Sequence, residues 1–229
     1  MNNTMRRNHT DLRALLHLAA EAAEEETKDK EHRANAGEKT LTVETVDNHV
    51  YFYADVDSDR VLALMRAVKE IDRELRNERI SRQIPDDYPQ TPIWLHIHSN
   101  GGDVFAGLSA ADQLRGIKTP IFSVIEGMCA SAATLIAISA RRRYIMPSAF
   151  MLIHQISAFA WGTHEQFKDE MRLQEMLMET LMKWYSEHSK LDPEAIREML
   201  RRDSWMNAQQ ALEAGFVDAI LESEAVDGQ

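Results

Sequence analysis

The chain has 229 residues, of which 26 are basic and 37 acidic, giving a net charge of −11 at neutral pH. This acidic balance argues against a nucleic-acid partner, because a protein face that binds nucleic acid must be basic. With 44% hydrophobic residues, the chain can build the core of one large domain, alone or with an appendage.

Cysteine usage and hydropathy indicate the cellular compartment. The single cysteine, Cys129, excludes an internal disulfide and suits a reducing environment. No apolar run approaches the roughly 18 residues that a membrane span needs. Residues 1–10 are polar and lack the apolar core of a signal peptide. We therefore expect a cytoplasmic protein with no membrane association.

Residues 1–40 differ in composition from the rest of the chain. Thr10 can cap a helix whose short apolar stripe is followed by a run rich in Glu, Asp and Lys. We predict an N-terminal charged helical extension over 1–40 and a second domain over 41–229. The extension is typical of a solvated helix, and a docking or self-association arm is the alternative.

Strand and helix patterns alternate from residue 41 onward. Strands are predicted at 41–46, 50–53, 93–97, 121–125, 144–146, 150–153 and 216–221. Helices are predicted at 58–75, 104–115, 132–140, 164–188, 193–202 and 207–215, with a polar loop at 76–91. Asp57 and Asp192 are expected to cap two of these helices, and Asn207 is expected to start the last one. This alternation implies an α/β protein with a largely parallel sheet.

The segment from Gly127 to Ala133 is the first candidate for chemistry. An apolar strand is expected to turn sharply through Gly127 into a helix, which leaves Ser131 with an exposed hydroxyl. Backbone N–H groups at a helix N-terminus have no internal partners and favour negative charge nearby. A nucleophile beside such donors suits acyl transfer. The same small residues are also typical of a helix start selected for tight packing.

A serine nucleophile needs a base, and the base needs an acid that orients it. Of nine histidines, His154 is the best base, because it ends an apolar strand of the same α/β core. His96 and His98 alternate along one strand and share a face. No third metal ligand is suggested for them, so we expect surface or interface residues. Neither a metal nor a cofactor is predicted.

The turn Ser99-Asn100-Gly101-Gly102 joins a predicted strand to a predicted helix. Glycines at such a turn let the backbone approach a substrate and point its N–H groups outward. The turn is therefore either half of an oxyanion hole, with the N–H of Ala132 as the other half, or a tight connection. A phosphate-binding loop is not expected, because no lysine follows.

Four segments together resemble the ClpP-type serine peptidases, the proteolytic subunits of the Clp protease. They are Ser-Asn-Gly-Gly-Asp-Val-Phe-Ala-Gly at 99–107, Gly-Met-Cys-Ala-Ser-Ala-Ala at 127–133, Met-Leu-Ile-His-Gln at 151–155, and residues 202–218. The resemblance runs from about Asp47 to Leu221. It implies a ClpP/crotonase-like fold with repeated β-β-α units, a mainly parallel sheet and a long "handle" helix at 164–188.

The resemblance also implies roles for particular residues. Ser131 matches the nucleophile, His154 the general base and Asp203 the acid that orients it, although the residues alone do not separate Asp203 from Asp192 or Asp218. It further implies a protein or peptide substrate and a homo-oligomeric ring, usually of seven subunits and stacked in pairs. Any ATP use would belong to a partner AAA+ ATPase that feeds in unfolded chains.

This sequence departs from the family pattern in three places. The usual propeptide and axial loop are not recognisable in residues 1–40, Ile156 replaces the proline that follows His-Gln, and residues 157–162 replace a glycine-rich strand. That strand holds the substrate backbone in the family, so the sequence predicts altered specificity. Residues 103–107 and 160–162 also resemble Clp-related phage head-maturation proteases, and a capsid-processing role is therefore an alternative.

Three further alternatives stay open at this point. A crotonase-like acyl-CoA enzyme would share the fold and the paired N–H groups but not the triad. An inactive ring subunit would keep the fold with a vestigial site. Cys129 as the nucleophile would lie two residues before Ser131, away from the helix donors. The related serine–lysine signal-peptide peptidases normally carry a membrane anchor, which the sequence does not show.

Overall fold

The computed structural model describes residues 43–157 and 162–222, so the extension predicted at residues 1–40 lies outside them. The strands are β1 (Glu44–Val46), β2 (His49–Phe52), β3 (Ile93–Ser99), β4 (Ile121–Ala130), β5 (Arg142–Ile145), β6 (Phe150–Ile153), β7 (Ser204–Asn207) and β8 (Ala219–Ile220). The helices are α2 (Ser58–Ser81), α3 (Val104–Arg115), α4 (Ala132–Ile138), α5 (His164–Glu187), α6 (Pro193–Leu200) and α7 (Ala208–Ala214).

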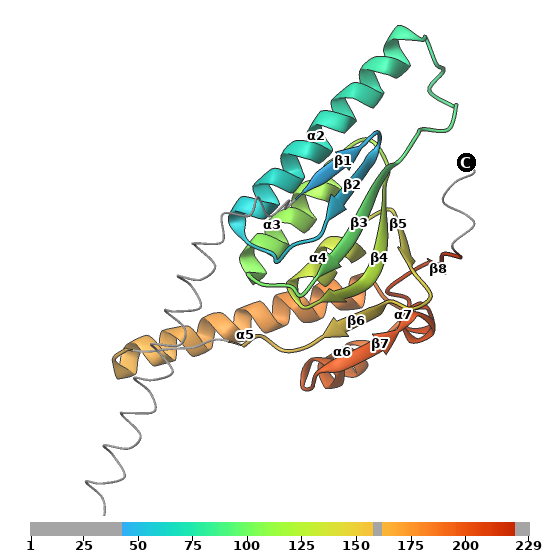
Figure 1. Ribbon diagram of the computed structural model, residues 1–229. Helices are drawn as coiled ribbons and strands as arrows, with labels where there is room; N and C mark the ends of the chain where they lie inside the picture. The colour runs from blue at the N-terminus through green and yellow to red at the C-terminus, as the bar shows by residue number, and fades with distance from the viewer. Residues whose placement is uncertain (1–42, 158–161, 223–229) are drawn as a thin grey trace, which may run out of the picture. The chain divides into compact units, whose positions relative to one another are not determined.

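The strands form one mixed sheet in the order β1-β2-β3-β4-β5-β8. Pairing is parallel from β2 to β8, whereas β1 is antiparallel to β2 (Figure 1). On the side away from β3, β4 is long enough to pair with two strands. Its first half pairs with β5 and its last residues pair with β6, both in parallel. β7 then adds to β6 in the antiparallel sense. The predicted α/β class with a mainly parallel sheet is confirmed.

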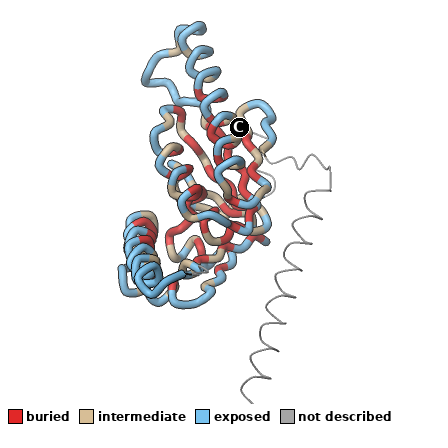
Figure 2. Tube along the Cα trace, turned by 90° about the vertical axis from the view of Figure 1, so that its left-hand side faces the viewer, coloured by how far each residue is buried: buried red, intermediate tan, exposed pale blue. Residues whose placement is uncertain are grey.

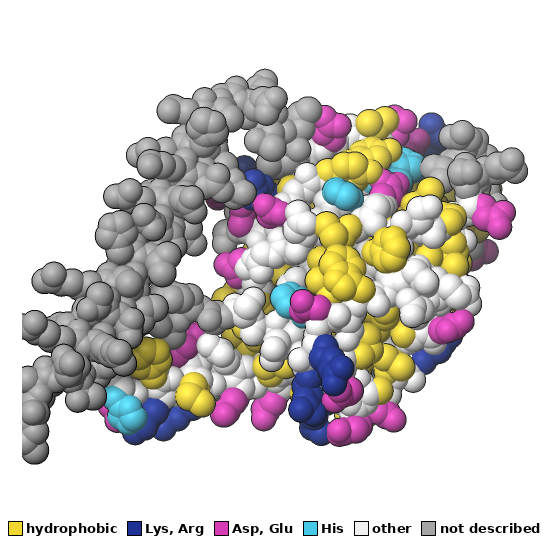
Figure 3. Space-filling view, turned by 60° about the horizontal axis from the view of Figure 1, so that its bottom comes forward, with side chains coloured by type: hydrophobic (Ala, Val, Ile, Leu, Met, Phe, Trp, Pro, Cys, Tyr) yellow, Lys and Arg dark blue, Asp and Glu magenta, His cyan; other side chains and the backbone are white. Residues whose placement is uncertain are grey.

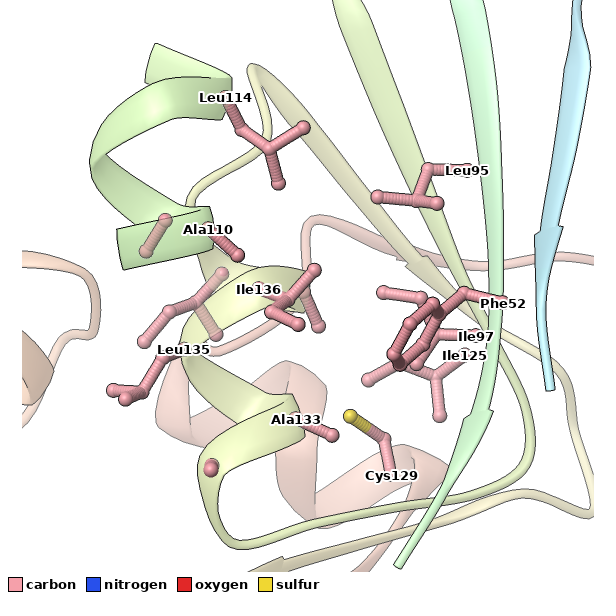
Figure 4. Close-up of a cluster of buried hydrophobic side chains, with 14 of the residues drawn as sticks. Phe52, Leu95, Ile97, Ala110, Leu114, Ile125, Cys129, Ala133, Leu135 and Ile136 are labelled. Atoms are coloured by element: carbon pink, nitrogen blue, oxygen red, sulfur yellow. The ribbon is translucent and has the colours of Figure 1, made fainter. Parts of the chain in front are cut away.

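The core lies between one face of this sheet and the helices α2, α3 and α4. Alternate strand residues point inward, as the two-residue period of a strand requires. The buried contacts between strands and helices involve Phe52, Leu95, Ile97, Ile125, Ala110, Leu114, Leu135 and Ile136 (Figure 4). The most buried elements are β3, β4 and α4, whereas β1 and the outer sides of α2 and α5 are exposed (Figure 2).

The other face of the sheet carries aromatic rings. Alternation places His49, Tyr51, Tyr53, Trp94, His96, His98, Phe122 and Tyr144 there, and we call this set the aromatic face. Rings from neighbouring strands stack, for example Tyr51 on His96 with ring centres 4.5 Å apart. This face is partly exposed, and only His96 of the set is fully buried.

Helix starts agree with the predicted caps. Asp57 accepts a hydrogen bond from the N–H of Arg60 at the start of α2, and Asp192 does the same for Ala195 at α6. Asn207 forms a capping box with Gln210 at α7, which ends at Gly215 in the left-handed conformation. These local signals fix element boundaries because they satisfy N–H and C=O groups that a helix end leaves free.

The loop predicted at 76–91 is wrong in its first part, since α2 continues to Ser81. Arg82 pairs with Glu78 at 2.9 Å, and the Arg79 guanidinium bonds to the carbonyl oxygens of Pro85, Tyr88 and Pro89. Arg76, Glu78 and Arg79 are good helix formers, and the long side chain of Arg79 holds the following loop. The polar character of residues 76–81 was therefore not sufficient to predict a loop.

Two strand predictions also need correction. The chain does not turn at Gly127, because Met128–Ala130 pairs with Phe150–Leu152 and β4 runs on to Ala130. The last strand comprises only Ala219–Ile220, since the buried Phe216 and Val217 belong to the turn after Gly215. Among the helices that the structure describes, none combines the length and apolar character that a bilayer crossing requires.

Candidate active site

Parallel pairing of β4 with β6 brings two of the predicted site residues to one edge of the sheet. Ser131 directly follows β4 and His154 directly follows β6, so both lie at carboxyl ends of adjacent strands. β7 runs antiparallel to β6 with Ser204 opposite Ile153. The residues just outside that pair, His154 and Asp203, therefore face each other.

The measured distances describe a loose arrangement. His154 Nδ1 lies 3.8 Å from Asp203 Oδ1, beyond ordinary hydrogen-bond length. The Asp203 side chain is 75% exposed and that of His154 is 22% exposed. Among the bonds of the described residues, none joins Ser131 to His154, although both line one pocket. Such contacts are often long in a free enzyme and tighten when substrate binds.

The backbone of Ser131 is strained. Its φ of 55° and ψ of −129° fall in a region that residues with a side chain rarely adopt. Bonds hold both sides of the residue: its N–H donates to the Leu152 carbonyl at 2.9 Å, and its own carbonyl accepts from the Thr134 N–H at 2.9 Å. A serine on a sharp, strained turn from strand to helix is typical of a nucleophile.

Gly101 and Gly102 pack against the backbone around this turn. Gly101 has φ +91°, and a Cβ there would lie 2.5 Å from the Ala130 carbonyl oxygen and 3.1 Å from the Ala132 nitrogen. Gly102 has φ +145°, and a Cβ would lie 2.3 Å from the Val56 carbonyl oxygen. Both positions therefore require glycine, for space and for backbone conformation.

The three predicted N–H donors are not equivalent. The Gly101 N–H donates to Ser99 Oγ at 3.1 Å, so it is already occupied. Within the described part of the chain, no acceptor is found for the N–H of Gly102 or of Ala132. Gly102 and Ala132 both line the pocket with Ser131. The geometry thus brings together two free donors, a strained serine and a histidine.

The pocket has a volume of about 280 Å³ and lies between the serine turn, the start of α3 and α5. Its apolar wall is formed by Phe105, Leu135, Ile156, Leu173, Leu177 and Leu181. Besides Ser131 and His154, its polar lining consists of Asp103, Gln155, Ser157, Glu170, Gln174 and Tyr185. A larger hollow of about 390 Å³ lies beside the end of α2, and none of the predicted site residues lines it. Pocket size alone therefore does not point to the predicted site residues.

Other candidate residues from the sequence are engaged elsewhere. Cys129 is fully buried in the core (Figure 4), and burial raises the pKa of its thiol, which disfavours a thiolate nucleophile. Asp192 caps α6, and Asp218 pairs with Arg143 at 2.7 Å. Of the three aspartates left open, Asp203 is the one beside His154.

His96 is not the surface residue that the sequence predicted, since it is 3% exposed. Its Nδ1 lies 2.7 Å from Glu126 Oε1 and its Nε2 lies 2.9 Å from His49 Nδ1. Tyr53 donates its hydroxyl to the other oxygen of Glu126. His98 is exposed, as expected, and contacts the Glu126 carbonyl oxygen at 2.9 Å.

Two buried hydroxyl groups behind the serine turn were not among the predicted site residues. Thr134 Oγ1 donates to the Ser131 carbonyl oxygen at 2.6 Å, and it lies 2.7 Å from the hydroxyl of Tyr185. The spacing of Thr134, three residues after Ser131 on a helix, was a usable signal. Nothing local in the sequence links Tyr185 to this turn.

In both sequence and structure, the chain is similar to proteins of one family. A sequence model of the family described as Clp protease matches residues 47–224. The ATP-dependent Clp protease proteolytic subunit of Streptococcus sanguinis is 33% identical over 178 residues, covering 75% of this chain and 89% of the relative. That of Leuconostoc citreum is 38% identical over 138 residues, covering 58% and 68%. The structure of a ClpP1 point mutant from Listeria monocytogenes superposes with a TM-score of 0.64 at 23% identity, covering 77% and 92%.

Proposed function

We propose that this chain, which belongs to the Clp protease family, is a serine endopeptidase that uses Ser131, His154 and Asp203. The observation that carries the proposal is the strained Ser131, held beside two free N–H groups in a pocket that His154 also lines. Neither a metal nor a cofactor is needed for this chemistry.

Each residue has a defined step in the proposed reaction. Ser131 Oγ attacks the carbonyl carbon of the peptide bond while His154 takes the hydroxyl proton. His154 then gives that proton to the leaving amine, and Asp203 holds the imidazole in the required tautomer. Because the Gly101 N–H is bonded to Ser99, we assign the oxyanion to the N–H groups of Gly102 and Ala132. Gly101 has no side chain, and this lets the turn at residues 99–102 pack closely against the turn at Ser131.

The pocket supports a preference for substrates with an apolar side chain at the cleaved bond. Its leucine-rich wall extends from Ser131 along α5, and the polar Glu170 and Gln174 contribute on the same helix. A hydrophobic wall gains free energy when it buries an apolar group. We expect cleavage after residues such as leucine or methionine, and slow cleavage after acidic residues.

A ring-shaped homo-oligomer is the proposed assembly, with protein substrates fed in by a partner AAA+ ATPase. What supports self-association is exposed apolar surface: Phe167, Met171 and Met176 on α5 are exposed, as are Phe150 on β6 and Trp205 on β7. Figure 3 shows hydrophobic side chains gathered in patches on the face that carries these elements. Exposed apolar patches of this kind mark interaction sites in many proteins.

The experiment combines activity, labelling and native mass. Wild-type protein should cleave a fluorogenic peptide and react with a fluorophosphonate, a reagent that modifies activated serines. Ser131→Ala should lose both while its native mass stays that of the wild-type assembly. A crotonase-like enzyme of the same fold would bind acyl-CoA and leave the reagent unreacted. Equal labelling of Ser131→Ala, or labelling at no residue of the wild type, would refute the proposal.

A further inference from the structure

A buried pair of hydroxyl groups links the long helix α5 to the candidate nucleophile. Thr134 on α4 is fully buried and Tyr185 on α5 is 2% exposed. Their hydroxyl oxygens are 2.7 Å apart, and Thr134 Oγ1 is 2.6 Å from the carbonyl oxygen of Ser131. The two side chains therefore form a continuous chain of hydrogen bonds ending on the serine backbone.

Counting protons fixes the direction of these bonds. A carbonyl oxygen can only accept, so the single proton of the Thr134 hydroxyl points to Ser131. Thr134 Oγ1 must then accept the proton of the Tyr185 hydroxyl. Burial raises the pKa of Tyr185, so this phenol keeps its proton at neutral pH. The Tyr185 hydroxyl therefore donates to Thr134, and the Thr134 hydroxyl donates to the Ser131 carbonyl oxygen. In such a chain each hydrogen bond polarises the next.

The accepting carbonyl belongs to the peptide group that also carries a candidate oxyanion donor. The peptide unit is planar and trans, so the Ser131 C=O and the Ala132 N–H lie in one plane and point in opposite directions. The Thr134 hydroxyl and N–H draw the carbonyl toward α4. The Ala132 N–H must then face away from them, and Ala132 lines the pocket on that side.

Resting on the serine peptidase function above, we propose that Thr134 and Tyr185 are positioning residues that orient the Ser131–Ala132 peptide group for catalysis. Neither side chain reacts with the substrate. Thr134 acts on the peptide group directly, and Tyr185 acts through Thr134 by fixing its hydroxyl rotamer. A strained backbone persists only where its surroundings hold it, and these two hydroxyl groups are part of that support.

Three substitutions separate positioning from general stability. Thr134→Val keeps the shape and removes the hydroxyl, and we expect kcat to fall about a hundredfold, the scale of a misplaced catalytic group. Tyr185→Phe should lower kcat about tenfold, because Thr134 keeps its bond to Ser131 but loses its orientation. Thr134→Ser restores the hydroxyl and should stay within about threefold of wild type. KM should be unchanged in all three.

A matched control and a double variant sharpen the test. Ser123 is a fully buried serine whose hydroxyl donates to the Ala137 carbonyl of the same helix α4 at 2.7 Å, without touching Ser131. Ser123→Ala should lower Tm but not kcat. If Tyr185 acts through Thr134, adding Tyr185→Phe to Thr134→Val should change kcat no further. We call this action of Tyr185 through Thr134 the relay. Independent, multiplicative losses of kcat in the double variant would overturn it.

A second readout does not depend on activity. Amide hydrogen exchange of peptides spanning 128–138, followed by mass spectrometry, reports on the Thr134 N–H that bonds to Ser131. Exchange there should be faster in Thr134→Val and Tyr185→Phe than in Ser123→Ala. Normal kcat and normal exchange in Tyr185→Phe would refute the relay while leaving the peptidase proposal intact. If wild type neither cleaves nor labels, the peptidase proposal fails, and exchange alone decides the relay.

Discussion

Strand β4 carries two polar clusters that differ in geometry. The Glu126 cluster consists of His49, Tyr53, His96 and Glu126 on the aromatic face. His96 lies 2.9 Å from His49 and 2.7 Å from Glu126, and Tyr53 donates to Glu126. The Ser131 cluster consists of Ser131, His154 and Asp203 at the strand end, where the histidine and carboxylate are 3.8 Å apart. The better-formed network contributes no residue to the pocket that Ser131 and His154 line.

Tight hydrogen bonds therefore do not mark the candidate active site of this protein. The Glu126 cluster is held by three strands in fixed register, with His49, His96 and Glu126 on β2, β3 and β4. The Ser131 cluster is assembled from residues just outside β4, β6 and β7, beyond the paired residues of those strands. Strain at Ser131, free N–H groups and an adjacent pocket distinguish it, and those are the features that acyl transfer uses.

Removing the histidine of each cluster should give the largest contrast. His154→Ala is expected to lower kcat on the order of 10⁵- to 10⁶-fold, as loss of a general base does in triad enzymes. His96→Ala should leave kcat within about threefold and lower the stability by about 1–3 kcal/mol, because it removes a buried imidazole and leaves its half-buried partners His49 and Glu126 without their hydrogen bonds. Peptide-cleavage kinetics and urea unfolding of both variants measure this. Comparable kcat losses would contradict the separation of the two clusters.

Replacing the carboxylate of each cluster should give the same kind of contrast in kcat, but a smaller one. Asp203→Asn is expected to lower kcat by about 10⁴-fold, since the imidazole then takes the wrong tautomer. Glu126→Gln keeps its shape and should leave kcat unchanged. Asp192→Asn, at a cap remote from His154, is the control for losing an acidic group. If Asp203→Asn retained full kcat, another residue would have to orient His154.

Glycine at position 102 should matter for rate as well as for folding. In Gly102→Ala the new Cβ would meet the Val56 carbonyl at 2.3 Å with φ at +145°, so the turn must shift and take its N–H with it. We expect kcat to fall about 10²-fold, the loss of one oxyanion donor. Gly116→Ala, whose Cβ meets nothing closer than 3.3 Å, is the matched control. Equal rates for the two variants would remove Gly102 from the mechanism.

These two clusters also show what could be predicted from the sequence. The caps at Asp57, Asp192 and Asn207 are local, and their predictions were confirmed. The extension of β4 beyond Gly127 depends on pairing with β6, which lies 20 or more residues away, and local patterns predicted a turn instead. Long-range pairing decided where Ser131 sits.

The site residues also divide into those that local sequence signals predict and those that depend on long-range strand pairing. Ser131 and His154 could be proposed from strand ends, but Asp203 required the family resemblance, because its approach to His154 depends on antiparallel pairing of β6 with β7. The Glu126 cluster could not be predicted, since it needs the register of three strands. Asp203 and both free N–H donors stay proposals until their variants are measured.

The smallest expected effect is a pH dependence that belongs to the Glu126 cluster. Burial alone would raise the pKa of Glu126, but hydrogen bonds from His96 and Tyr53 outweigh it and hold that pKa below the ordinary 4.5. Burial, with the neighbouring His96, lowers the pKa of His49 below its ordinary 6.5. Both groups therefore bind protons more weakly in the folded protein than in the unfolded chain.

Folding stability should accordingly decrease as the pH falls. The contribution of His49 is complete above pH 6.5 and is lost as the pH falls through its lowered pKa. That of Glu126 is complete above pH 4.5 and is lost below it. Urea unfolding of wild type and Glu126→Gln between pH 7 and pH 3.5 measures both contributions. The variant should lose the decrease in stability below pH 4.5, because its amide does not titrate, and should keep the decrease below pH 6.5 that belongs to His49. The Glu126 charge raises the pKa of His49, so removing that charge should not weaken the His49 contribution. Parallel curves for the two proteins would show that Glu126 is not the titrating group.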